Sequence, residues 1–192
     1  MLRKSIITLF LFVFFLPIIC FSTQAFEPLE VVILPTYNTD KYFKDQETID
    51  KMEYKLKRHF RYPYYELVTP ENIKNAILAL DPSLKNTNPC DQTFLKNVAD
   101  KTCADIVVIL HIKRAYSCTY SIGIFNPEDI QETSVELYCY IYSVKDNYYN
   151  NFKKVLNKKD FPTVHSGLDE VLPDLTDELI KKLPYKTIPG VK

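Results

Sequence analysis

Residues 30–35, with the sequence EVVILP, form a short and almost continuously apolar run that is rich in β-branched side chains. Such a run is typical of a strand that is covered on both faces, and therefore of a central, parallel strand. Parallel strands need crossover connections, which usually contain a helix. This one segment therefore favours an α/β fold and requires helices further along the chain.

Segments with helical periodicity do alternate with strand-like segments after this run. The spacing of apolar residues predicts helices over residues 46–60, 69–81, 91–102 and 168–183. Runs rich in β-branched and aromatic residues predict four more strands, over residues 64–68, 104–120, 133–144 and 148–156. Polar turns are expected at residues 36–45 and 126–129. Pro173 is expected to kink or divide the last helix.

This order predicts a single α/β domain over residues 26–192, in which helices pack on a mixed sheet of about five strands. The early crossovers predict parallel strands, and the later short turns predict an antiparallel meander. If the second and third strands flank the first, the strand order is 2-1-3-4-5. The chain then reverses direction beside the first strand.

In open α/β sheets, ligands favour the crevice at the carboxyl ends of the strands beside such a reversal. Here the loop that follows the first strand edges that crevice. Its candidate contact residues are Tyr37, Asn38, Thr39, Asp40 and Lys41, which follow Thr36. The alternative is a polar connecting loop that binds no ligand.

Residues 1–25 have the features of a secretory signal peptide. Two cations precede a short apolar run, and small residues stand before an expected cut in front of Phe26. We therefore expect export to the periplasm or cell envelope, with secretion from the cell as an alternative. A membrane-spanning helix needs about 17–25 apolar residues, and this run is shorter and contains Pro17. Membrane attachment is expected only if the leader is retained or Cys20 is acylated.

The charge balance excludes one class of partner. Arg3 and Lys4 leave with the leader, so 22 basic side chains face 24 acidic ones in the mature chain. This balance gives no electrostatic footprint for nucleic acid. The chain also has only three glycines, which argues against a glycine-rich phosphate cradle. We therefore expect neither nucleic acid nor a cofactor.

Patterns typical of catalytic or metal sites are absent from the sequence. His59, His111 and His165 are scattered, no C-x₂-C or H-x₃-H pair occurs, and no G-x-S-x-G motif is present. The acidic residues of the last predicted helix are interpreted as its solvated face. The sequence therefore predicts no catalytic residue and no metal ligand.

Four cysteines remain after the leader, and export favours disulfides over free buried thiols. Cys118 and Cys139 fall on neighbouring predicted strands, and pairing them would keep the apolar faces aligned. Cys90 and Cys103 bracket the predicted helix at 91–102 and could join its two ends. Such crosslinks would stabilise the fold and supply no chemistry.

The strand over residues 133–144 carries Tyr138, Tyr140 and Tyr142 on one face. Two interpretations are open for this row. It could be a protein-binding surface, because tyrosine is enriched at interfaces. Alternatively it packs beneath the last helix, whose broad apolar stripe needs cover, and this second interpretation is favoured here.

Residues 31–38 (VVILPTYN) resemble the "VAVLPF-x-N" opening of bacterial envelope proteins in the CsgG-like and LpoB-like group. The amino-terminal domain of TolB has a similar fold. The resemblance continues through the amphipathic helix at 47–60, through YELV at 65–68 and through the ADIVV strand at 104–108. It implies a non-enzymatic envelope module that works by binding other proteins.

The sequence thus favours an exported binding or assembly module of a bacterial cell envelope, with an envelope protein as its partner. Two alternatives stay open at the carboxyl end of the first strand. One is a hydrolase or thiol enzyme, and the other is a binder of a small ligand. An enzyme would lose its function, with folding intact, when Asn38 or Asp40 is changed.

Overall fold

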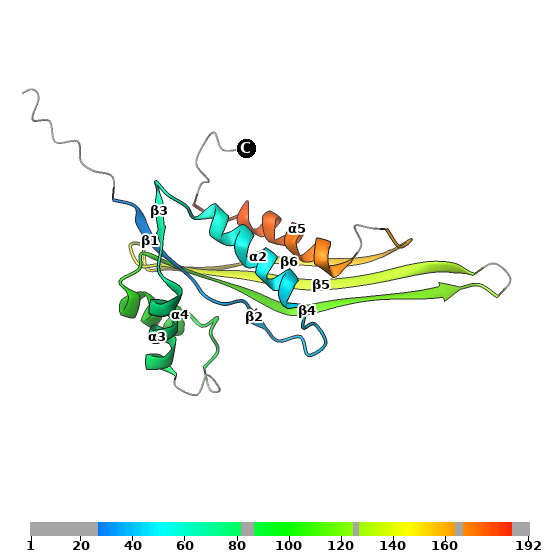
Figure 1. The fold of residues 1–192 in the computed structure, drawn as a ribbon, viewed down its shortest axis with the longest axis horizontal. Helices are drawn as coiled ribbons and strands as arrows, with labels where there is room; N and C mark the ends of the chain where they lie inside the picture. Colours follow the sequence, from blue (N-terminus) through cyan, green and yellow to red (C-terminus); the bar gives the residue numbers. More distant parts are fainter. Residues whose placement is uncertain (1–26, 82–86, 125–126, 164–166, 186–192) are drawn as a thin grey trace, which may run out of the picture.

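A computed structural model describes residues 27–81, 87–124, 127–163 and 167–185. One mixed sheet organises these residues (Figure 1). Its strands are β1 (Leu29–Ile33), β2 (Tyr37–Asn38), β3 (Tyr65–Leu67), β4 (Ile106–Ile122), β5 (Glu128–Ser143) and β6 (Tyr148–Asp160). The helices are α2 (Gln46–His59), α3 (Pro70–Leu80), α4 (Gln92–Thr102) and α5 (Leu168–Ile180).

The strand order is β3-β1-β4-β5-β6, with β2 paired to β4 beyond the end of β1. Strands β3, β1 and β4 are parallel, and β4, β5 and β6 are antiparallel. The predicted mixed sheet and its 2-1-3-4-5 order are confirmed. The short strand β2 was not expected, because its two residues lie in a segment predicted as a polar turn.

Strand β1 is central, as its apolar run predicts, and both of its faces are covered. Val31 and Ile33 pack into the core beneath α2 and α5, whereas Val32 and Leu34 pack with α3 and α4 on the other side. Each of these four side chains is at most 6% exposed. Burial on both faces explains why residues 31–34 are all apolar rather than apolar at alternate positions.

The helices pack on both faces of the sheet, and the layer on one face is more extensive than the layer on the other. Helices α2 and α5 lie side by side along one face, tied together by Lys55 and Asp177 at 2.5 Å (Figure 1). Helices α3 and α4 cover the other face only near β1 and the start of β4. Helix α5 is continuous through Pro173, so the predicted division is wrong. The missing N–H leaves only the carbonyl of Asp169, an exposed residue of the first turn, without its helical donor.

Strands β4 and β5 form a long hairpin that projects past α2 and α5 (Figure 1). The predicted turn at 126–129 is partly wrong, because β5 begins at Glu128 and pairs with Ile122. A bulge between Ile112 and Arg114 further shifts the register. Glu128 and Asp129 have the composition of a turn, and this part of the hairpin lies outside the helical cover, so no buried face marks it as a strand.

The tyrosine face of β5 points away from α5, so the favoured sequence interpretation was wrong. Leu137, Cys139 and Ile141 pack beneath α5, and Tyr138 and Tyr140 lie on the opposite face. Tyr142 is buried in the α3–α4 core. The last helix covers the aliphatic face because that face supplies the apolar area that its own stripe needs.

The predicted leader at residues 1–25, including Cys20, lies outside the described residues, as does His165. Within the described ranges, no helix is long and apolar enough to cross a membrane.

Candidate functional site

The uncovered part of the sheet carries a continuous group of aromatic and charged side chains, which we call the open face. It lies on the same side as α3 and α4, beyond the area that these helices cover. Strands β2, β4, β5 and β6 all contribute to it. Its residues are Tyr37, His111, Lys113, Arg114, Glu136, Tyr138, Tyr140 and Lys153.

A stack of rings forms the centre of the open face. His111 lies 4.9 Å from Tyr37, 6.0 Å from Tyr138 and 6.2 Å from Tyr140, measured between ring centroids. Tyr138 and Tyr140 are 5.9 Å apart, and their planes differ by 21°. The stack therefore joins rings from three neighbouring strands into one aromatic surface.

Two contacts hold the ring of Tyr149 at the end of the stack nearest α4. Tyr149 stacks on Tyr140 at 6.4 Å, and its hydroxyl donates a hydrogen bond of 2.9 Å to the carbonyl oxygen of Cys90. Cys90 lies just before α4. The ring positions are therefore set by both the strands and the neighbouring helix, and little side-chain freedom remains for a partner to restrict.

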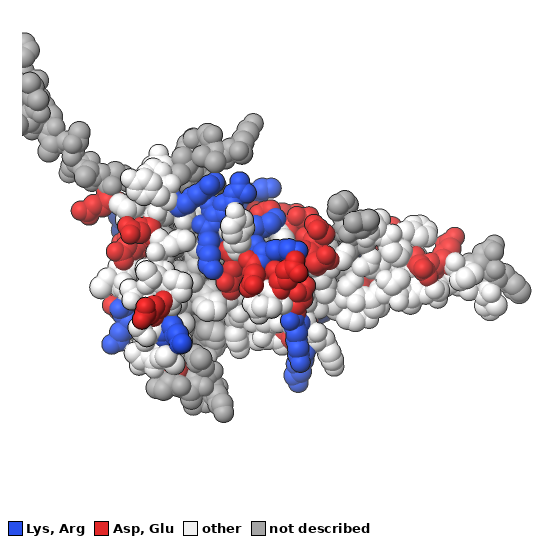
Figure 2. Space-filling view, viewed as in Figure 1, with Lys and Arg blue, Asp and Glu red and all other residues white. Residues whose placement is uncertain are grey.

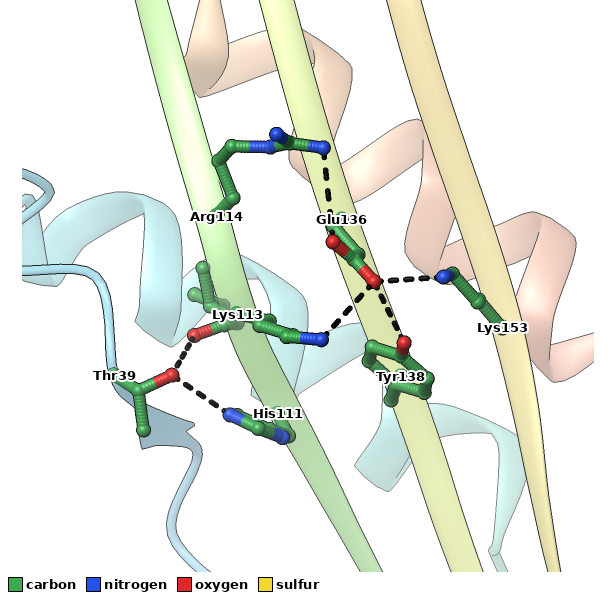
Figure 3. A network of polar contacts seen from close by, with 8 residues as sticks. Thr39, His111, Lys113, Arg114, Glu136, Tyr138 and Lys153 are labelled. Carbon is green, nitrogen blue, oxygen red and sulfur yellow. Dashed lines mark hydrogen bonds and ion pairs between the residues drawn. The ribbon is translucent and has the colours of Figure 1, made fainter.

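A half-buried carboxylate organises the charges of the open face (Figure 3). Glu136 is 12% exposed, and its carboxylate lies 2.7 Å from Lys153, 3.5 Å from Lys113 and 3.6 Å from Arg114. It also accepts a hydrogen bond of 2.6 Å from the Tyr138 hydroxyl. The bonds from Lys153 and Tyr138, helped by the Lys113 charge, lower the pKa of Glu136 to about 2.

The cations outnumber the anions at this point. Lys113, Arg114 and Lys153 are each about half exposed, and two carboxylates oppose their three charges: Glu136 directly, and Asp40 through its electrostatic interaction with Arg114. Lys113 and Lys153 also lie over the Tyr138 ring, at 5.8 and 5.2 Å from its centroid. The open face is therefore an aromatic surface with a surplus of positive charge.

His111 joins the predicted contact loop to this surface. Its Nε2 atom lies 2.9 Å from the hydroxyl oxygen of Thr39, and its buried Nδ1 atom has no hydrogen-bond partner in the described part of the chain. Burial, assisted by the Lys113 charge, lowers the pKa of His111. The imidazole is therefore neutral at pH 7.

The structure divides the five predicted loop residues between two roles. Tyr37 and Thr39 reach the open face through His111. Asn38 and Asp40 instead shape the loop itself. Asn38 donates to the Phe43 carbonyl oxygen at 2.7 Å, and Asp40 accepts from the backbone N–H groups of residues 42, 43 and 115. Lys41 is exposed.

The charged half of the open face was missed from the sequence. Alternation along the strand places Glu136 on the same face as the tyrosines, but nothing in the sequence brings Lys113, Arg114 and Lys153 to it. A usable signal in the sequence is that Glu136 is an acidic residue among tyrosines. Because a half-buried carboxylate needs a cationic partner, this pattern indicates cations on the neighbouring strands.

All four cysteines of the described chain are free thiols, so neither expected crosslink is present. Cys118 lies opposite Glu132, whereas Cys139 lies opposite Leu110. Eight residues along β4 separate these two places, roughly 25 Å at the rise of a strand. A disulfide needs Cα atoms within about 7 Å, so the predicted Cys118–Cys139 pairing is wrong. This pairing was predicted from a different register of β4 against β5. The register differs because β5 is longer than the sequence predicted.

These environments predict a graded reactivity of the thiols toward N-ethylmaleimide. Cys103 is exposed and should be labelled first, and half-buried Cys118 second. Cys90 and Cys139 should resist labelling until the chain unfolds, because burial raises the pKa of both thiols to about 12. Mass spectrometry of the native chain over time measures the order. Early modification of Cys139, with Cys103 still unmodified, would contradict this arrangement.

No family model and no curated protein sequence matches the chain. Solved structures with similar folds include the LpoB C-terminal domain from Salmonella enterica, at 12% identity and a TM-score of 0.44. That match covers 71% of this chain and 87% of the other. Lipoprotein GNA1162 from Neisseria meningitidis is 12% identical with a TM-score of 0.45, over 81% of this chain and all of its own.

A homolog of neuraminyllactose-binding hemagglutinin from Helicobacter pylori is 11% identical with a TM-score of 0.49, over 85% of this chain and 87% of its own. The LpoB C-terminal domain from Escherichia coli is also among the matched structures, at 12% identity and a TM-score of 0.42. At these identities the likeness is one of fold, and the chemistry of this chain follows from its own side chains.

Proposed function

We propose that this chain is a protein-binding or assembly module of a bacterial cell envelope, exported and without catalytic activity. The open face is its binding surface. The proposal rests on one observation, which is that helices cover the two faces of the sheet to different extents. Helices α2 and α5 cover one face, whereas α3 and α4 leave the stacked Tyr138 and Tyr140 of the other face only half-buried.

The chemistry of the open face suits a protein partner. Tyrosine and arginine are enriched where proteins bind one another, and ordered rings lose little entropy on binding. The surplus of positive charge favours a partner that presents acidic groups around an aromatic or apolar centre.

The hydrolase alternative is less well supported. Thr39 and His111 are as close as a nucleophile and its base, but the Thr39 hydroxyl also lies 3.3 Å from the carbonyl oxygen of Ile112. In the described chain no group holds the Nδ1 atom of His111, so the orienting member of a triad is missing. For the thiol alternative, the raised pKa values of Cys90 and Cys139 oppose thiolate formation.

Site-specific photocrosslinking in cells tests the proposal. Tyr116 and Val155 extend the open face, since Val155 lies opposite Glu136, and both are nearly half exposed. A photoreactive residue at either position should capture the same partner. Tyr54 on α2, 65% exposed, is the matched control position and should capture none of it. Adding Tyr138→Ala should lower the yield about tenfold, as for an interface hot spot.

Folding of each variant is checked by circular dichroism, because Tyr138 is half-buried. A partner captured equally from Tyr54, or a yield that survives both Tyr138→Ala and Lys153→Glu in folded protein, would rule out the open face as the binding surface. Turnover of a substrate that disappears with Thr39→Ala would favour the hydrolase instead.

A further inference from the structure

An apolar groove opens between α2 and α3, at the carboxyl ends of β1 and β3. Its volume is about 700 Å³. The walls are aliphatic, and their main side chains are Ile33, Leu67, Val68, Ile73, Ile77 and Leu78. Figure 2 shows uncharged surface between the charged side chains that cover α2 and those of α3. The groove shares no residue with the open face, so it is a separate feature of the molecule.

Two leucines of the wall are exposed to solvent. Leu67 is 37% exposed and Leu78 is 42% exposed, although both line the same hollow. Ligand sites in proteins are typically concave, of about 300–1,000 Å³, and mostly apolar with a few polar groups. The groove has this size and this composition.

Three charged residues also line the groove, and together they determine its net charge. Lys57 and Glu53 belong to α2 and lie 3.3 Å apart, and Glu53 also accepts a hydrogen bond of 2.9 Å from the Thr36 backbone N–H. Lys74 belongs to α3 and forms no ion pair with any residue in the described ranges. Two cations and one anion leave one surplus positive charge, which complements a ligand with a single negative charge.

We propose that this groove binds a long-chain fatty acid, with its alkyl chain along the aliphatic walls and its carboxylate beside Lys74. The chain removes Leu67 and Leu78 from water, and the carboxylate provides the anion that Lys74 lacks. The groove lies at the carboxyl ends of β1 and β3, where the chain leaves these strands for α2 and α3. This site is independent of the partner surface proposed above.

Fluorescence titration with cis-parinaric acid, an 18-carbon fatty acid, tests the proposal on the full chain after removal of copurified lipid. Saturable binding that palmitate displaces is the expected result. Leu78→Asp places a charge against the alkyl chain and should weaken binding at least about tenfold. Ala79→Asp is the matched control, since it adds the same charge to the next residue of α3, outside the groove, and should leave affinity unchanged.

The role of the headgroup is tested separately. Lys74→Glu should weaken palmitate binding about fivefold, the usual size of an exposed charge contact, and should leave hexadecanol binding unchanged. No saturable binding of cis-parinaric acid, or equal affinity in Leu78→Asp and wild type, would overturn the proposal. A groove that bound only a peptide helix would give that negative result. Photocrosslinking from the open face is unaffected by either outcome.

Discussion

Replacing Asp40 by alanine is expected to lower the free energy of unfolding by about 2–3 kcal/mol, through the loss of charge-assisted hydrogen bonds to the backbone. The carboxylate accepts from the N–H groups of Tyr42 and Ala115, each at 2.8 Å, and from Phe43 at 3.3 Å. Burial opposes ionisation of Asp40, but these three donors outweigh it and lower its pKa. The variant leaves them without an acceptor, and Ala115 is buried.

Urea denaturation at pH 7 measures this effect. Lys41→Ala, at the next and exposed position, is the control and should change the free energy of unfolding by less than about 0.5 kcal/mol. The experiment also separates the two interpretations of the loop. If Asp40→Ala kept wild-type stability and lost an activity, Asp40 would be a ligand or catalytic residue, contrary to the role in loop structure described here.

A Glu136→Gln variant is expected to lose stability at neutral pH and to approach wild type in acid. In the folded chain the pKa of Glu136 is about 2, below its ordinary value of 4.5. A depressed carboxyl pKa stabilises the fold above about pH 5, and this contribution is lost as the pH falls toward 2. Because the three cations are half exposed to solvent, we expect about 1–2 kcal/mol at pH 7 rather than the full value of the shift.

Urea midpoints of wild type and variant, compared at intervals from pH 7 down to pH 3, give this difference directly. Glu132→Gln is a matched control on the same strand, because Glu132 pairs with Lys159 at 3.0 Å but is 37% exposed. It should cost less than about 0.5 kcal/mol. A constant difference between Glu136→Gln and wild type across this pH range would show that the carboxylate is not held in its ionised form by the cations.

The parallel half of the fold was predictable because its strands are buried on both faces. Such strands are apolar throughout, so β1 and the start of β4 are recognisable without knowing their neighbours. Asp45 and Thr69 cap the amino-terminal ends of helices α2 and α3, and the side chain of each accepts hydrogen bonding from backbone N–H groups of the first turn. Local sequence therefore specified these elements and the order of the sheet.

The antiparallel half of the sheet was harder to predict, because its register and its covered face depend on contacts between strands. The register of β4 and β5 is set by the position of their turn and by the bulge after Ile112, and neither has a strong sequence signal. The face that α5 covers was ambiguous because tyrosines can be buried or exposed with similar ease. The charges around Glu136 come from three strands, so only the folded sheet brings them together.

The central position of β1 also has a consequence for how the chain acquires its fold as it is made. β1 is the first described strand, but its neighbour β4 follows some 75 residues later, at the pairing of Val31 with Ile106. Strand β3 can pair with one edge of β1 earlier, but a chain that emerges from its amino terminus leaves the other edge of this largely apolar strand unpaired until β4 has followed. Proteins with such exposed strand edges aggregate readily, so this interval is when the chain most needs a chaperone.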